Sequence, residues 1–159
     1  MTEYRFLDSG DGQKLEAFGE VVLIRPCQQA VWTPRLSKKE WDRADARFTR
    51  EGKKGWEIKR KIPSSWVVSI DGMMLKAMLT DFGHVGIFPE HKFLWSYLTK
   101  KLKKGSSFLN LFAYSGAATL AAAKCGASVC HVDASKPMVA WARENAAHNQ
   151  LEKAPIRWI

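Results

Sequence analysis

The chain has 159 residues, 46% of them apolar, and a formal net charge of +9. This length suffices for one good core or two small ones, which excludes a complete seven-stranded cofactor-binding sheet together with a second domain. No apolar run approaches the roughly 20 residues that span a bilayer, and three cysteines without C-x-x-C spacing predict a reduced cytoplasmic protein without structural zinc.

The first 34 residues predict short β strands separated by turns. Residues 4–7 alternate along the chain, 15–18 form a second short segment, and 21–24 (VVLI) are strongly β-prone before Pro26. We expect this region to open a small β-rich domain.

Residues 35–61 differ in character, with eleven Lys or Arg against five acids. Ser37 is expected to cap a helix over 38–48, and 52–55 are expected to form a basic loop. The helix would carry three apolar side chains at helical spacing: Trp41, Ala44 and Phe48.

The basic segment 35–61 also favours RNA binding. Lys and Arg meet phosphates while bases stack on aromatic rings, here Trp41, Phe48 and Trp56. The alternative is a solvated charged face whose aromatic side chains are ordinary anchors.

Two strands, 66–70 and 73–79, are predicted to form a hairpin around Asp71 and Gly72. Pro89 then begins a helix that carries four lysines near its C-terminal end, where cations suit the helix dipole. We divide the chain into a β-rich region, 1–88, and the beginning of a cofactor-binding sheet, 89–159. The helix has an expected apolar stripe of Phe93, Leu94, Tyr97, Leu98 and Leu102.

The stretch 106–134 organises the second region. An apolar run at 108–112 predicts a strand, small residues at 117–125 predict a buried helix that ends before Gly126, and 129–132 predict a second strand. Strand, helix and strand in this order open a doubly wound α/β sheet.

The turn 113–116 and Asp133 follow the carboxyl ends of these two strands, which is where open parallel sheets bind ligands. Their residues therefore indicate which ligand to expect. Asp133, 17 positions after Gly116, can accept hydrogen bonds from ribose hydroxyls. A dinucleotide site needs G-x-G-x-x-G, but Gly116 is the only glycine in this turn, and the bulky residues Phe112 and Tyr114 precede it. The turn 113–116 therefore favours S-adenosylmethionine (SAM), which has no phosphate, over NAD.

Beyond Asp133, Ser135 is expected to cap a helix that runs to about His148. Residues 156–159 then predict the opening of a third strand, inside which the chain stops.

The segments N-L-F-A-Y-S-G-A (110–117), V-D-A-S (132–135) and H-x-G-x-F-P-E-H (84–91) make the chain resemble class I SAM-dependent methyltransferases. The resemblance is to the group that contains the bacterial 23S rRNA cytosine and guanine methyltransferases, and it extends to 8–19. It implies a Rossmann-like SAM-binding sheet and an activity on RNA such as ribosomal RNA.

The resemblance also implies the cofactor-binding residues. Phe112, Tyr114 and Gly116 would line the methionine end of SAM, with Asn110 and Ser115 in the same turn region. Asp133 would hold the ribose and Ser135 would lie beside the adenine. Phe88 and His91 would cover the pocket.

Such enzymes carry a D-P-P-x-F or N-P-P-like catalytic loop after the fourth strand, and no two prolines are adjacent here. We therefore expect an N-terminal portion that is inactive by itself, and we assign no catalytic residue. The four histidines lack metal spacing, so no metal ligand is assigned.

Two other functions remain open. The chain could be a non-catalytic RNA-binding module that uses 1–88, or a nucleotide-dependent oxidoreductase. A half-sheet also leaves an open edge, which predicts homodimers or aggregation.

Overall fold

The computed structural model describes residues 2–50 and 55–159. Four residues of the basic segment, 51–54, lie outside the described residues, so the predicted loop at 52–55 is described only at Gly55. The chain has a mixed α/β architecture with a β-rich N-terminal region, which confirms the predicted fold class. It divides into two compact units, residues 1–69 with 77–85, and residues 70–76 with 86–159.

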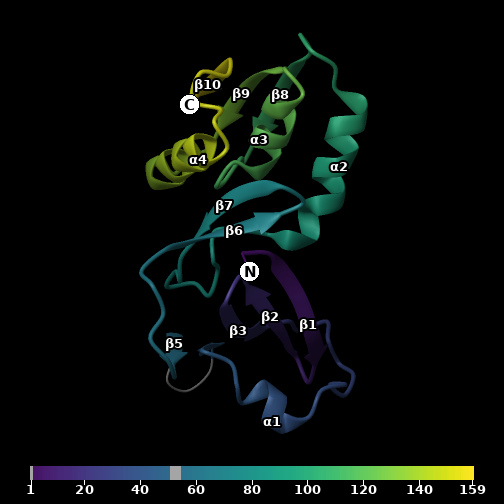
Figure 1. Cartoon of the computed structure of the whole chain (residues 1–159), viewed down its shortest axis with the longest axis vertical. Coiled ribbons are helices and arrows are strands. Elements are labelled where there is room, and N and C mark those ends of the chain that lie inside the picture. Colours follow the sequence, from purple (N-terminus) through teal and green to yellow (C-terminus); the bar gives the residue numbers. More distant parts are fainter. Residues whose placement is uncertain (1, 51–54) are drawn as a thin grey trace. The chain divides into compact units, whose positions relative to one another are not determined.

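The first unit is built on a five-stranded sheet in sequential order (Figure 1). Neighbouring strands are antiparallel except for the third and fourth, which are parallel. Most apolar side chains on the second and third strands are buried, and in both strands consecutive residues are buried, so both faces of the sheet are covered there. The strands are β1 (Tyr4–Gly10), β2 (Gln13–Phe18), β3 (Val21–Pro26), β4 (Ala46–Thr49) and β5 (Gly55–Ile58).

The predicted helix over 38–48 is wrong, because helix α1 (Lys38–Trp41) ends after about one turn and β4 follows. Asp45 explains the early end. Its carboxylate accepts a hydrogen bond from the Val22 amide at 2.7 Å, and its own amide donates to the Val22 carbonyl at 2.8 Å. These bonds direct the chain into pairing beside β3, and tertiary contacts override helical spacing.

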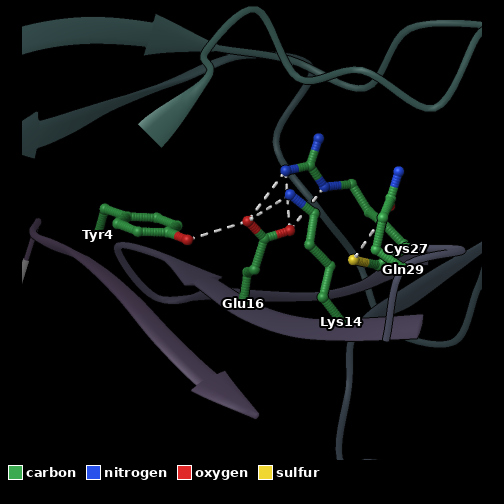
Figure 2. Close-up of polar contacts among 6 residues, drawn as sticks. Tyr4, Lys14, Glu16, Cys27 and Gln29 are labelled. Atoms are coloured by element: carbon green, nitrogen blue, oxygen red, sulfur yellow. Dashed lines mark hydrogen bonds and ion pairs between the residues drawn. The ribbon is translucent and has the colours of Figure 1, made fainter. Parts of the chain in front are cut away.

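A buried charge cluster joins the first three strands, as Figure 2 shows around Glu16. Glu16 is fully buried and accepts two hydrogen bonds from the Arg25 guanidinium, at 2.8 and 3.0 Å. The Tyr4 hydroxyl donates to the same carboxylate at 3.0 Å, and the Lys14 ammonium lies 3.2 Å from it. A buried carboxylate needs such partners, because an unpaired charge would be strongly destabilising.

Strands β6 (Trp66–Ile70) and β7 (Met73–Ala77) form a two-stranded sheet, which confirms the predicted hairpin. Its turn residues Asp71 and Gly72 both have positive φ, 49° and 73°. Two successive left-handed residues are typical of the tight hairpin turns that match strand twist.

The second unit contains a three-stranded parallel sheet in the order β10-β9-β8 (Figure 1). Strand β8 is Ser107–Leu111, β9 is Ser128–Val132 and β10 is Ile156–Trp158. Between them lie α3 (Ala117–Lys124) and α4 (Lys136–His148), which confirms the predicted order of strands and helices. The 3₁₀ turn η1 (Pro89–His91) and helix α2 (Lys92–Lys101) precede the sheet.

Only one face of this sheet is well covered. Asn110 and His131, on adjacent strands, both contact α3 through Thr119. On the opposite face Leu109 and Leu111 remain 59% and 54% exposed. A parallel sheet is normally covered on both faces, so this one presents an apolar surface.

The predicted apolar stripe of α2 is only partly correct. Of its members only Leu98 is buried, while Phe93, Leu94 and Tyr97 are 76%, 48% and 56% exposed. Trp95 is buried instead, three positions before Leu98, because these two side chains share the face of the helix that packs in the unit's core.

Three side chains spaced four residues apart, two on α4 and one on the residue directly after it, are hydrogen-bonded to the backbone of β7. The Trp141 indole donates to the Lys76 carbonyl at 3.1 Å, and the Asn145 side-chain oxygen accepts from the Lys76 amide at 2.7 Å. Asn149 both accepts from and donates to the Met74 backbone.

Within the described part of the chain, no helix has the length and apolar character of a membrane span.

Candidate cofactor site

The turn after β8 has an unusual backbone. Phe112, Tyr114 and Gly116 have φ of 54°, 52° and 86°, so every second residue is left-handed. For phenylalanine and tyrosine this conformation is uncommon, and such residues gather at ligand sites, where the surrounding structure holds them in place.

Asp133, at the end of β9, holds this turn. One carboxylate oxygen accepts a hydrogen bond from the Tyr114 amide at 2.7 Å, and the other accepts from the Ser135 amide at 2.9 Å. The Ala113 amide also donates to the Val132 carbonyl at 3.0 Å. Each carboxylate oxygen can accept more than one hydrogen bond, so Asp133 can support the turn and still accept from a ligand.

Two further contacts hold the turn after β8, one to Gly86 and one to helix α4. The buried Ser115 hydroxyl donates to the Gly86 carbonyl. Gly116 lies against α4, and a Cβ at this position would come within 2.8 Å of the Ala142 Cβ. Glycine is therefore required at 116 both for its positive φ and for close packing between α3 and α4.

A cavity of about 250 Å³ opens beside the turn. Whole-cofactor pockets usually span roughly 300–1,000 Å³, so this cavity suits one end of a cofactor. Three predicted site residues, Gly116, Asp133 and Ser135, do not line it. The other six do: Phe88, His91, Asn110, Phe112, Tyr114 and Ser115.

Aromatic rings form one wall of the cavity. The Phe88 ring centroid lies 5.2 Å from that of Tyr114 and 5.6 Å from that of His91. Phe112 is 92% exposed, so its ring remains available to a ligand. Such a wall suits the cationic sulfonium and the aliphatic side chain of SAM better than a pyrophosphate.

Asn110 also belongs to a buried polar chain under the turn. Its amide donates to the Thr119 hydroxyl at 2.9 Å, and that oxygen lies 2.9 Å from His131 Nδ1. His131 Nε2 is buried with no hydrogen-bond partner among the described residues. Burial lowers the pKa of His131 to about 4, with Asp133 opposing this shift and Arg143 adding to it. His131 is therefore neutral at pH 7.

Asn145 and Thr119 support the site but were not predicted from the sequence. Asn145 is fully buried, and its amide donates to the Ser115 carbonyl at 2.8 Å. The available signal was a polar residue four positions after Trp141, on the buried face of a predicted helix.

The described residues contain no group of three His, Cys, Asp or Glu side chains that could hold a metal ion. Cys27, Cys125 and Cys130 are free thiols.

No family model matches the chain. Over 148 residues, 88% of its length, it is 39% identical to a ribosomal RNA large subunit methyltransferase K/L from Shewanella frigidimarina. It is 32% identical over 131 residues to the protein of the same name from Colwellia psychrerythraea. The chain spans about a fifth of these two relatives, 19% and 18% of their lengths.

Among solved structures, the whole chain superposes on a SAM-dependent methyltransferase from Agrobacterium tumefaciens with a TM-score of 0.91 and 41% identity. It covers 52% of that chain. In sequence and fold, the chain is therefore similar to about half of that Agrobacterium tumefaciens methyltransferase.

Proposed function

We propose that the chain binds SAM at the carboxyl ends of β8 and β9, as part of a methyltransferase that acts on RNA such as ribosomal RNA. One observation carries the proposal. Asp133 joins the left-handed turn to the start of α4, at the strand ends where open sheets bind nucleosides. The similarity to SAM-dependent and ribosomal RNA methyltransferases supports it.

Each side chain then has a defined task. Asp133 accepts from the ribose hydroxyls, and Ser135 lies beside the adenine. Phe112, Tyr114 and Phe88 surround the methionine end, with His91, Asn110 and Ser115 completing the wall. Bound SAM supplies an electrophilic methyl group. The residues of this chain orient that cofactor, and positioning is the main contribution that methyl transfer requires of an enzyme.

Isothermal titration tests this cofactor assignment. S-adenosylhomocysteine, the demethylated form of SAM, should bind and NADH should bind more weakly or not at all. Tighter binding of NADH would favour the oxidoreductase alternative and overturn the proposal.

We also propose a division of tasks in which 89–159, with the adjoining Phe88, hold the cofactor, while the region 1–88 holds RNA through its basic segment 35–61. Of the nine described basic residues in this segment, all except Arg47 are exposed. Exposed cations can release condensed counterions from RNA, which predicts affinity that falls steeply with salt. Trp41 and Phe48 are only 6% and 5% exposed, so they are core residues and cannot stack on bases.

RNA binding by the purified chain, measured at 50 and 200 mM salt, tests this part separately from cofactor binding. Affinity that does not change with salt would contradict an electrostatic role for 35–61.

The three free thiols accord with the reducing cytoplasm, where we place the protein.

We further propose that two copies can pair along β8. Strand β8 is an edge strand of its sheet in the described chain, and two of its own residues, Leu109 and Leu111, are exposed. Unpaired edges recruit other strands. Light scattering should give a dimer that Leu109→Lys converts to a monomer, whereas a monomeric wild type would refute pairing.

A further inference from the structure

A tight loop in the first unit presents an exposed phenylalanine. The Gly83 amide donates to the Thr80 carbonyl at 3.0 Å, and the Thr80 amide donates to the His84 carbonyl at 3.0 Å. Phe82 lies between these closures and is 78% exposed. A single exposed aromatic ring is common on protein surfaces and does not by itself indicate a binding site. The way in which the surrounding loop is held is therefore the informative observation.

The loop is anchored on β4 and β5. The Trp56 indole on β5 donates to the Thr80 carbonyl at 2.7 Å. Gly83 lies against Phe48 of β4, so closely that a Cβ would come within 2.5 Å of the ring. Phe48 packs edge-on to Trp56, with centroids 5.2 Å apart. The loop that carries Phe82 is therefore anchored, and little conformational entropy is lost when a ligand stacks on the Phe82 ring.

Phe82 borders a cavity of about 720 Å³, and the residues around this cavity have the side-chain types that bind a nucleobase and its phosphate. Trp56 and Phe82 supply aromatic surface, Arg50 is an exposed cation, and the Asp81 carboxylate is an exposed acceptor. The described lining is Phe48, Thr49, Arg50, Gly55, Trp56, Asp81, Phe82 and His84.

We propose that this cavity binds one unstacked base of a single-stranded RNA. The base stacks on Phe82, its exocyclic amino group donates to Asp81, and Arg50 meets the adjoining phosphate. This inference rests on the RNA-binding part of the proposed function. It replaces the buried Trp41 and Phe48 with Phe82, which lies outside 35–61, as the ring that meets RNA.

Fluorescence anisotropy with a labelled ten-nucleotide adenosine RNA tests the inference. Phe82→Ala should weaken binding at least about fivefold, the lower end of what one stacked base contributes. Phe82→Trp should retain wild-type affinity within about twofold. The matched control is Phe6→Ala, which removes a 58% exposed phenylalanine from β1 of the same unit and should change affinity less than twofold.

The outcomes separate this inference from the proposed function. If the wild type binds the RNA and Phe82→Ala binds as tightly as Phe6→Ala, the base site is wrong while RNA binding stands. If the wild type does not bind the RNA, both fail. Titration of S-adenosylhomocysteine into Phe82→Ala should match the wild type, and a loss there would show that the substitution acts through folding and would overturn the assignment.

Discussion

The two units use polar side chains in different ways. In the first unit, the carboxylate of Glu16 is paired with Arg25 and Tyr4 inside the same sheet. In the second unit, Asp133 holds a left-handed turn at the edge of a cavity, and His131 Nε2 below it has no described partner. A self-contained network stabilises a fold, whereas polar groups gathered at a strained turn indicate a ligand site.

The largest effect on stability is expected at Gly116. Gly116→Ala should lower the free energy of unfolding by about 3 kcal/mol, because it adds a left-handed alanine and a collision with Ala142. Gly105→Ala is the matched control, since Gly105 has a φ of 83° but nothing within 4 Å of an added Cβ. It should cost about 1 kcal/mol in urea denaturation. Equal losses would mean that the close approach of α4 is not important.

Asp133→Ala should weaken S-adenosylhomocysteine binding about 30-fold, equivalent to about 2 kcal/mol, through loss of charged hydrogen bonds. RNA affinity should not change, because the first unit is untouched. Glu152→Ala, which removes an exposed acid from the same unit, should leave both titrations unaltered. An Asp133→Ala protein with wild-type cofactor affinity would refute the ribose role.

Acid should affect the second unit at a higher pH than the first. The pKa of His131 falls from 6.5 to about 4 on folding, so the unfolded chain binds more protons between these values. Stability is then lost as pH falls from 6.5 towards 4, by at most about 1.4 kcal/mol per pH unit. His131→Asn should flatten this slope in urea denaturation, and an unchanged slope would exclude His131 as its source.

Asp8 in the first unit responds only in stronger acid. Burial raises its pKa, but hydrogen bonds from Leu36, Trp41, Arg35 and Ser9 outweigh burial and lower the pKa below 3.8. Its contribution is present above pH 3.8 and is lost as pH falls below that value. Asp8→Asn should therefore leave the slope between pH 6.5 and 4 unchanged.

The smallest effect is expected at Tyr4. Tyr4→Phe removes one hydrogen bond to Glu16 and should cost about 1 kcal/mol in urea denaturation, without changing cofactor binding. Tyr97→Phe, at a 56% exposed position of α2, should cost nothing measurable. A loss of cofactor affinity in Tyr4→Phe would contradict the separation of the two units' tasks.

The second unit was largely predictable because its signals are local. Apolar runs, Gly116 and Asp133 occur in the order that a strand–turn–helix–strand unit needs, and the structure has them so. The cavity brings together six of the predicted site residues, from segments on both sides of α2. Their contact with SAM remains a prediction.

The failures come from contacts between distant residues. Residues 38–48 have helical spacing, but Asp45 binds the backbone of Val22 and converts the second half into β4. Trp41 and Phe48 were expected near RNA because composition does not reveal burial. Asn145 was missed because its partner, the Ser115 carbonyl, lies 30 residues away along the chain.

We propose above all that the second unit holds an adenosyl cofactor at the ends of β8 and β9. Hydrogen exchange of the whole chain, with and without saturating S-adenosylhomocysteine, tests it most directly. Cofactor binding there should slow the exchange of the amides in 113–118 and 133–136 and leave exchange in β1–β5 unchanged. If these two segments show no protection, or if the protected amides lie in the first unit instead, the cofactor does not bind at the ends of β8 and β9.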